Sequence, residues 1–268
     1  MRLSIWAVGC SALLASSAAL ASDLVLTQKA PPPPAQRSSW TGFHIGVNAG
    51  YGWAANTDSV RGANPATIVD WLYPGEIASP SLSQSGFIGG GQIGYDYAFT
   101  PSMVAGLAAD LSGANLRGTA FAAGTYDSSR VITGTADMKL FGTARARLGY
   151  APTGRLLAYA TGGLAYGDVS LSTGLSRPSP GLTGCENGAN NCERGSASAT
   201  KFGWTVGAGL GWALTNAWSV NAEYLYYDLG KISHSMADPY YPGTVFDATE
   251  PLRGDIVRVE LNYKFGGP

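Results

Sequence analysis

Residues 202–214 alternate strictly between small and bulky side chains. A repeat of two residues predicts a β-strand, because successive side chains of a strand point to opposite faces. A helix is disfavoured, since each of the four glycines in this stretch would destabilise it by about 1 kcal/mol relative to alanine. The stretch carries no charge, whereas a strand of a soluble sheet normally presents polar side chains to water. We therefore interpret 202–214 as a strand that crosses an outer membrane, with its bulky face toward lipid and its glycine face toward a narrow lumen.

Aromatic residues near the two ends of this strand support the same interpretation. Phe202 and Trp212 are ten positions apart, which is roughly 33 Å along a strand and roughly 25 Å across a membrane at a tilt of about 40°. This span matches the apolar band of membrane barrels. We expect an aromatic girdle at the membrane boundaries, formed by Trp53, Phe202, Trp204, Trp212, Trp218, Tyr263 and Phe265.

The same two-residue repeat recurs along the chain and predicts seven further strands. They cover about 40–53, 85–99, 103–112, 137–150, 155–169, 218–228 and 254–265. The connections alternate between long polar loops, at 55–84, 113–132, 170–199 and 229–253, and tight turns, at 100–102, 152–154 and 215–217. This alternation predicts an all-β fold, an eight-stranded antiparallel up-and-down transmembrane barrel with its long loops outside the cell. An even number of strands also lets the first and last strands pair, so that no sheet edge remains.

Two predicted strands differ in how clearly the alternation assigns their phase, that is, which face points into the lumen. In 137–150 the alternation places Met138 and Leu140 outward and Lys139 inward. In 155–169 the phase is ambiguous, because one face would carry Leu156, Leu164 and Tyr166, and the other Leu157, Tyr159 and Thr161.

Charged side chains fall on the lumen face of several predicted strands. In a barrel this small, side chains fill the interior, and buried charges must be paired. We therefore predict a lumen charge network on three strands, joined by Asp96 or Asp110, which consists of Arg145, Arg147, Glu223, Arg258 and Glu260. The network is either a polar plug or an ion path, and the plug is the favoured interpretation.

The N-terminal segment is typical of an exported protein. Residues 1–21 have a basic start, an apolar stretch and a small-x-small end at 19–21, which predicts a signal peptide. Residues 22–39 contain four consecutive prolines, which favour an extended periplasmic linker before the barrel domain at 40–265. After cleavage the chain keeps Cys185 and Cys192, and an even pair so close in an exported protein predicts a disulfide that closes a small loop.

Composition narrows the possible functions. Only 13% of the residues are charged, against roughly 25% in soluble proteins. Removal of the signal peptide takes away Arg2, so 16 basic residues face 18 acidic ones and the net charge becomes −2, which argues against nucleic-acid binding. The two histidines, His44 and His234, are far apart in sequence, and no pattern indicates a metal or another cofactor.

Several linked segments resemble one known family. They are Trp40-Thr41-Gly42-Phe43 with the glycines that follow, 142–150 with its Gly-x-x-Arg-x-Arg-Leu-Gly-Tyr pattern, 157–167, and the alternating residues of 259–265. Together they are similar to the outer-membrane β-barrel proteins of α-proteobacteria, called porin-family or outer membrane immunogenic proteins. The resemblance covers about 40–265. It implies an eight-stranded barrel, insertion into the outer membrane by the barrel-insertion machinery, surface-exposed loops and no catalytic residues.

Three classes of function follow from this interpretation. The favoured one is a non-enzymatic barrel of the cell outer membrane with a structural or surface-antigen role, whose partners are outer-membrane lipids and lipopolysaccharide. The second is a narrow diffusion pore for small solutes. The third is a lipid-modifying enzyme or protease, which would need a nucleophile, a histidine and an acid near the outer rim. A soluble barrel that binds a small ligand is a further alternative, and no sequence pattern identifies a ligand of the loops.

Overall fold

The computed structural model describes residues 40–57, 59–63, 76–78, 81–123, 131–176, 192–237 and 245–265. The predicted signal peptide, the linker and Cys185 lie outside these ranges. Every regular element within them is a β-strand. Over the same ranges, no helix has the length and apolar character needed to cross a bilayer.

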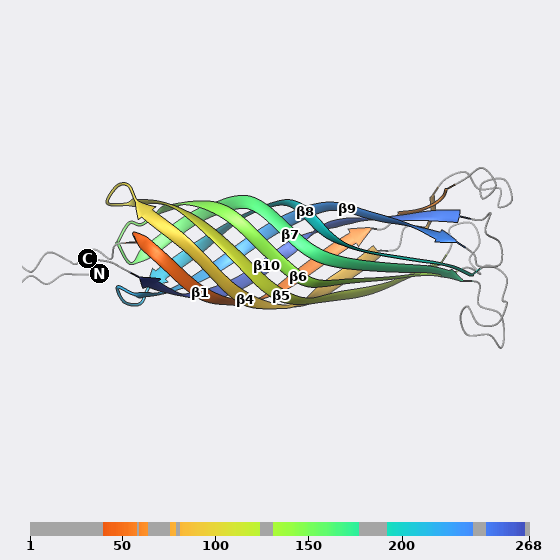
Figure 1. Cartoon of the computed structure of the whole chain (residues 1–268), viewed down its shortest axis with the longest axis horizontal. Helices are drawn as coiled ribbons and strands as arrows, with labels where there is room; N and C mark the ends of the chain where they lie inside the picture. Colours follow the sequence, from red (N-terminus) through yellow and green to blue (C-terminus); the bar gives the residue numbers. More distant parts are fainter. Residues whose placement is uncertain are drawn as a thin grey trace, which may run out of the picture. The chain divides into compact units, whose positions relative to one another are not determined.

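The strands form a closed antiparallel ring (Figure 1). Its members follow the order β1, β4, β5, β6, β7, β8, β9, β10, and β10 pairs again with β1. The short strand β2 extends the sheet by pairing with β10, and β3 pairs with β2. The bounds are β1 (Gly42–Thr57), β2 (Ser59–Gly62), β3 (Glu76–Ala78), β4 (Ser81–Ala98), β5 (Met103–Ala123), β6 (Val131–Tyr150), β7 (Leu156–Ser176), β8 (Cys192–Ala213), β9 (Trp218–Ala237) and β10 (Val245–Phe265).

The strands are tilted relative to the axis of the ring (Figure 1). If hydrogen-bonded partners are followed once around from Phe43, the circuit returns to β1 at Trp53, which is 53 − 43 = 10 residues further along. Such a stagger is what closing a sheet into a barrel requires. Height here means position along the barrel axis, measured from the tight turns. Residues at the same height are therefore not hydrogen-bonded partners, because each step to the next strand of the ring raises the height by little more than one residue.

The strands are longer than the hydrophobic pattern predicted. The segments 55–84, 113–132, 170–199 and 229–253 were expected to be loops, yet strands run into all four. The first contains β2, β3 and the start of β4, β5 continues to Ala123, and β7, β8, β9 and β10 extend into the others. The prediction was wrong because it looked for rows of bulky outward residues, and on these extensions only isolated ones such as Phe121 remain. Other outward positions there carry hydroxyls, such as Ser170 and Ser198, whose Oγ atoms lie 2.8 Å apart, while inward positions such as Leu171 remain apolar.

One phase prediction is also wrong. Met138 is 3% exposed on the inside of the ring, and Lys139 lies exposed on the outside. The pairing of β6 with β7 shifts register between Met138 and Leu140. A bulge of this kind inserts an extra residue and reverses the faces beyond it. Nearer the tight turns β6 keeps the predicted phase, with Arg145 buried and Ala144 exposed.

The structure resolves the ambiguous phase of β7. Leu157, Tyr159 and Thr161 are at most 6% exposed and point into the ring, whereas Leu164 is 68% exposed on its outside. The inner face therefore keeps the polar hydroxyls of Tyr159 and Thr161.

The interior is divided along the axis into apolar and polar layers. Near the tight turns, a small apolar cluster contains Trp40, Val104 and Leu157. The charged residues described below follow, and above them lies a larger apolar cluster whose members include Phe141 and Tyr227. Above a short polar step at Gln84 and Glu250, a third apolar cluster is made of Val60, Ile132, Met236, Phe246 and Ala248.

The bulge in β6 can be tested with a matched pair of substitutions. Met138→Gln buries an amide in an apolar layer and is expected to lower the free energy of unfolding by about 1–3 kcal/mol. Lys139→Gln, one residue away on the outer face, is expected to change it by less than about 0.5 kcal/mol. Urea unfolding of the detergent-folded protein measures both changes. A larger loss of stability for Lys139→Gln than for Met138→Gln would contradict the bulge and show that the side chains of β6 alternate without interruption.

Candidate functional site

Two arginines and two carboxylates form the centre of the polar layer. Arg145 Nη1 lies 2.6 Å from Glu223 Oε1, and Arg145 Nη2 lies 3.1 Å from Asp110 Oδ2. Arg258, which is 1% exposed, donates to the same two acids, through Nε to Glu223 Oε2 at 2.8 Å and through Nη2 to Asp110 Oδ2 at 3.1 Å. Each acid is therefore shared by both guanidinium groups. This sharing matters because a buried charge without a partner is strongly destabilising.

Glu260 and three neutral side chains add hydrogen bonds around this centre. Glu260 Oε1 lies 3.2 Å from Arg258 Nη2, and Glu260 Oε2 accepts from Gln92 Nε2 and Asn221 Nδ2, each at 3.0 Å. Thr143 donates its hydroxyl proton to Asp110 and accepts from Arg145 Nε at 2.8 Å. Gln92, Asn221 and Thr143 sit on inward positions, so their phase was the signal that could have placed them in the network.

Arg147 belongs to a second cluster, nearer the tight turns. It donates through Nε to Asp96 Oδ1 at 2.6 Å, and its Nη2 lies 3.2 Å from His44 Nε2. Asp96 Oδ2 also lies 3.6 Å from His44 Nδ1, and the guanidinium carbon of Arg147 lies 5.7 Å from the centre of the Tyr159 ring. Both aspartates proposed as additional members are therefore present, but in different clusters. Glu223 and Arg147, which the sequence placed in one network, have different partners.

Inward glycines leave the space that these long side chains occupy. A Cβ at Gly106 would lie 2.0 Å from Asp96 Oδ1, and one at Gly50 would lie 2.6 Å from the Cβ of Arg258. A larger residue at either position would collide with the charged layer. The small residues of the sequence repeat thus leave the space that the buried arginines fill.

The polar layer is nearly neutral and is enclosed. Arg145, Arg147 and Arg258 face Asp96, Asp110, Glu223 and Glu260, so formal charges of +3 and −4 leave a net of −1. The side chains of all seven are at most 8% exposed. The larger apolar cluster begins above this layer with Phe141 and Tyr227, whose ring centroids are 5.2 Å apart. Apolar clusters therefore lie on both sides of the charged layer.

The outer surface of the ring is apolar over a continuous band. Large hydrophobic side chains that a soluble protein would bury are exposed here, among them Phe87 at 76% and Leu164 at 68%. Aromatic rings gather at the two edges of the band, and many of them touch, as Trp204 and Tyr226 do at 5.5 Å and Trp218 and Tyr263 at 5.0 Å.

All seven predicted girdle residues point outward. Trp212, Trp218, Tyr263 and Phe265 lie at the edge near the tight turns, and Trp53, Phe202 and Trp204 lie at the opposite edge. The sequence prediction omitted further members of the girdle, which the outward phase of their strands could have identified: Phe43, Tyr51, Phe87, Tyr95, Tyr97, Tyr150, Tyr166 and Tyr226.

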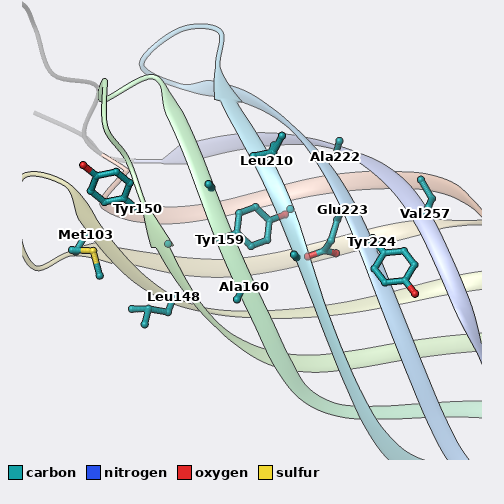
Figure 2. Close-up of a pocket in the computed structure, with 14 residues that line it drawn as sticks. Met103, Leu148, Tyr150, Tyr159, Ala160, Leu210, Ala222, Glu223, Tyr224 and Val257 are labelled. Carbon is teal, nitrogen blue, oxygen red and sulfur yellow. The ribbon is translucent and has the colours of Figure 1, made fainter.

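Between the aromatic edges the band is shallowly hollowed. Figure 2 shows one groove of about 730 Å³ on the outside of β6 to β9, where the alanines Ala160 and Ala222 lie between larger side chains such as Leu148 and Leu210. Its walls are almost entirely apolar, and Tyr159 and Glu223, which also border it, are 5% and 4% exposed. A groove of this chemistry suits hydrocarbon chains.

His234 does not form a hydrolytic triad with its described neighbours. His234 was expected in a loop, but it is an inward residue of β9, and burial lowers the pKa of its imidazole. Ser235 donates to Asp247 at 2.7 Å on the opposite, outer face, so these three side chains do not form a triad. In the ranges that the structure describes, no three His, Cys, Asp or Glu side chains are grouped so that they could hold a metal ion. Cys192 begins β8 and Cys185 lies outside the described residues, so their disulfide stays a prediction.

Comparison with known proteins agrees with this geometry. Residues 10–265 match the family model described as "Outer membrane protein beta-barrel domain". The chain belongs to this outer-membrane β-barrel family. It is 34% identical to the 31 kDa outer-membrane immunogenic protein of Brucella melitensis, over 95% of this chain and 96% of that protein. It is 27% identical to the 25 kDa outer-membrane immunogenic protein of Brucella abortus, over 93% and 92% of the two chains.

Solved structures of low sequence identity include the outer membrane protein OprG of Pseudomonas aeruginosa. That likeness has 12% identity and a TM-score of 0.46, and it covers 85% of this chain and 97% of that one. Membership of the family places the protein in the outer membrane, and the exposed apolar band is the surface that meets the lipid.

The charge layer predicts a large difference between two arginines. Arg258→Met leaves Asp110, Glu223 and Glu260 without one of their partners, and we expect it to lower the free energy of unfolding by about 3–5 kcal/mol. Arg117→Met is the matched control, because Arg117 is 67% exposed and pairs with Asp137 at 3.5 Å on the outer surface; an exposed pair contributes at most about 1 kcal/mol. Equal urea midpoints for the two variants would show that the buried layer does not stabilise the barrel.

Proposed function

We propose that this protein is a non-enzymatic, eight-stranded transmembrane barrel with a plugged lumen, which has a structural and surface-antigen role. The observation that carries the proposal is the enclosed charge layer. A diffusion pore needs a continuous path of water, whereas here the guanidinium groups of Arg145 and Arg258 bind carboxylates across the lumen. Apolar clusters then cover this layer on both sides.

The surface-antigen part of the proposal depends on the extended strands. Beyond the outer aromatic edge, β7 continues to Ser176 and β9 to Ala237, which carries their connections away from the lipid band. The relatives in Brucella are named immunogenic proteins. With the extended strands directed out of the cell, the tight turns face the periplasm. The predicted signal peptide and linker place the N-terminus of the mature protein on the same side. The barrel-insertion machinery remains the expected route into the membrane.

The plug is tested by electrical recording. Purified protein inserted into planar lipid bilayers is expected to show no steady open conductance, because apolar layers separate the lumen charges from bulk water. Insertion is verified on the same sample by protection of the barrel from added protease. A steady open level with verified insertion would favour the narrow diffusion pore.

The orientation is tested by labelling intact cells. In a Cys185→Ser, Cys192→Ser background, Ser172→Cys places a thiol on the exposed outer face of the β7 extension, and Thr153→Cys places one in an exposed tight turn. A membrane-impermeant maleimide is expected to label the first variant and to label the second only after the outer membrane is permeabilised. Immediate labelling of the second variant alone would reverse the orientation.

A further inference from the structure

Above the outer aromatic edge, outward-facing cations of the ring gather at one height. They are Arg117 on β5, Lys139 on β6, Lys231 on β9 and Arg253 on β10, and all four are exposed. With the stagger of the ring taken into account, all four lie just beyond Trp53, Phe87, Trp204 and Tyr226. An edge of aromatic rings marks the boundary between acyl chains and head groups. The cations are thus at the height of the lipid head groups.

One of these four cations is already paired on the outer surface. Arg117 forms an ion pair with Asp137 at 3.5 Å. Lys139, on the adjacent strand, forms no ion pair among the described residues. Arg117 is therefore not free to share an anion with Lys139.

Lys231 and Arg253 are differently placed. They lie on adjacent strands, diagonal to each other across the bulge of β9, and among the described residues neither forms a salt bridge. Two carboxylates share this outer face: Asp228 is directly opposite Arg253, and Asp255 is two residues along β10 from it. Their hydrogen-bond partners are other donors, since Asp228 Oδ1 accepts from the backbone N–H of Gly230 at 2.8 Å and Asp255 accepts from the Tyr224 hydroxyl. Both acids are half-buried, and the two cations are exposed.

The surface around Lys231 and Arg253 is arranged in three tiers. Below them lie the aromatic side chains of Trp204, Tyr224 and Tyr226. Above them lie hydroxyls, with Ser233 Oγ 2.9 Å from Thr249 Oγ1. An amphiphile with acyl chains, a phosphate and sugar hydroxyls presents the matching groups in the same order. By contrast, β1 and β4 carry no outward cation at this height, where Ala55, Thr57, Ser83 and Ser85 stand.

We propose that Lys231 and Arg253 bind a phosphate of the glycolipid that forms the outer leaflet, namely the lipid A part of lipopolysaccharide. An arginine beside a lysine supplies fork-shaped and point-like donors to one anion, and such charge-assisted hydrogen bonds are the strong ones. The β9–β10 face thereby holds a specific lipid, while the remainder of the band contacts acyl chains without selection. This inference depends on the proposed orientation, since only that orientation puts the cations in the outer leaflet.

The test compares two double variants of the full-length, detergent-folded protein. Diphosphorylated lipid A is titrated and the bound fraction is read by native mass spectrometry, with dephosphorylated lipid A as the second ligand. For Lys231→Gln with Arg253→Gln we expect the apparent Kd to rise roughly twenty-five-fold, because each Lys or Arg beside an anionic lipid surface contributes about a factor of five. The wild type is expected to bind the dephosphorylated lipid as weakly as this variant binds lipid A.

The matched control is Arg117→Gln with Lys139→Gln, which removes the same charge at the same height. Its apparent Kd is expected to change by less than about threefold, since Arg117 is already paired with Asp137 and Lys139 has no second free cation beside it. Equal losses in the two double variants, or no loss in either, would overturn the site. Heat-modified migration on gels verifies that each variant is folded.

A failure of the proposed function gives a different result. Wild-type protein that does not insert into phosphatidylcholine vesicles would contradict the transmembrane barrel itself. Protein that inserts but binds both forms of lipid A equally would contradict only the phosphate site.

Discussion

Backbone hydrogen bonding is the constraint on which the rest of this structure depends. Lipid offers no partner for an N–H or C=O group, so a membrane-crossing sheet must satisfy every one of them internally. The pairing of β1 with β10, from Phe43 opposite Phe265 to Trp53 opposite Asp255, closes the ring and removes its edges. Closure fixes the stagger and the narrow width, and these decide what can lie inside and outside.

A narrow ring has to fill its own interior. Long side chains reach across it only where the facing residues are small, and Gly50 and Gly106 provide that room. Arg258 can then meet Asp110 and Glu223, which belong to strands on either side of it in the ring. The same contacts pair these charges and fill the centre of the ring with side chains.

The outside of the ring changes its chemistry along the barrel axis. Exposed aliphatic and aromatic residues form the band that meets hydrocarbon, Lys231 and Arg253 lie just beyond its aromatic edge, and Ser/Thr rows follow on the extended strands. The described ring thus presents a graded lateral surface around an interior that is filled by charged and apolar side chains.

The alternation of residues by itself determined the strand type, the outward set from Phe202 to Phe265 and the inward set that includes Arg145 and Glu260, because side-chain direction in a strand is a local property. It could not place Met138, since a bulge is set by pairing with β7, nor choose the face of β7, whose two sides are equally apolar. Only the tertiary structure showed that Arg147 and Asp96 form one ion-pair cluster and that Arg258 and Asp110 belong to another. The partner of a buried charge depends on the stagger between distant strands. The length of the strands above the lipid was likewise decided by packing inside the ring, where Leu171 of β7 and Ile232 of β9 continue the apolar core although the outer face of these two extensions carries no large apolar residue.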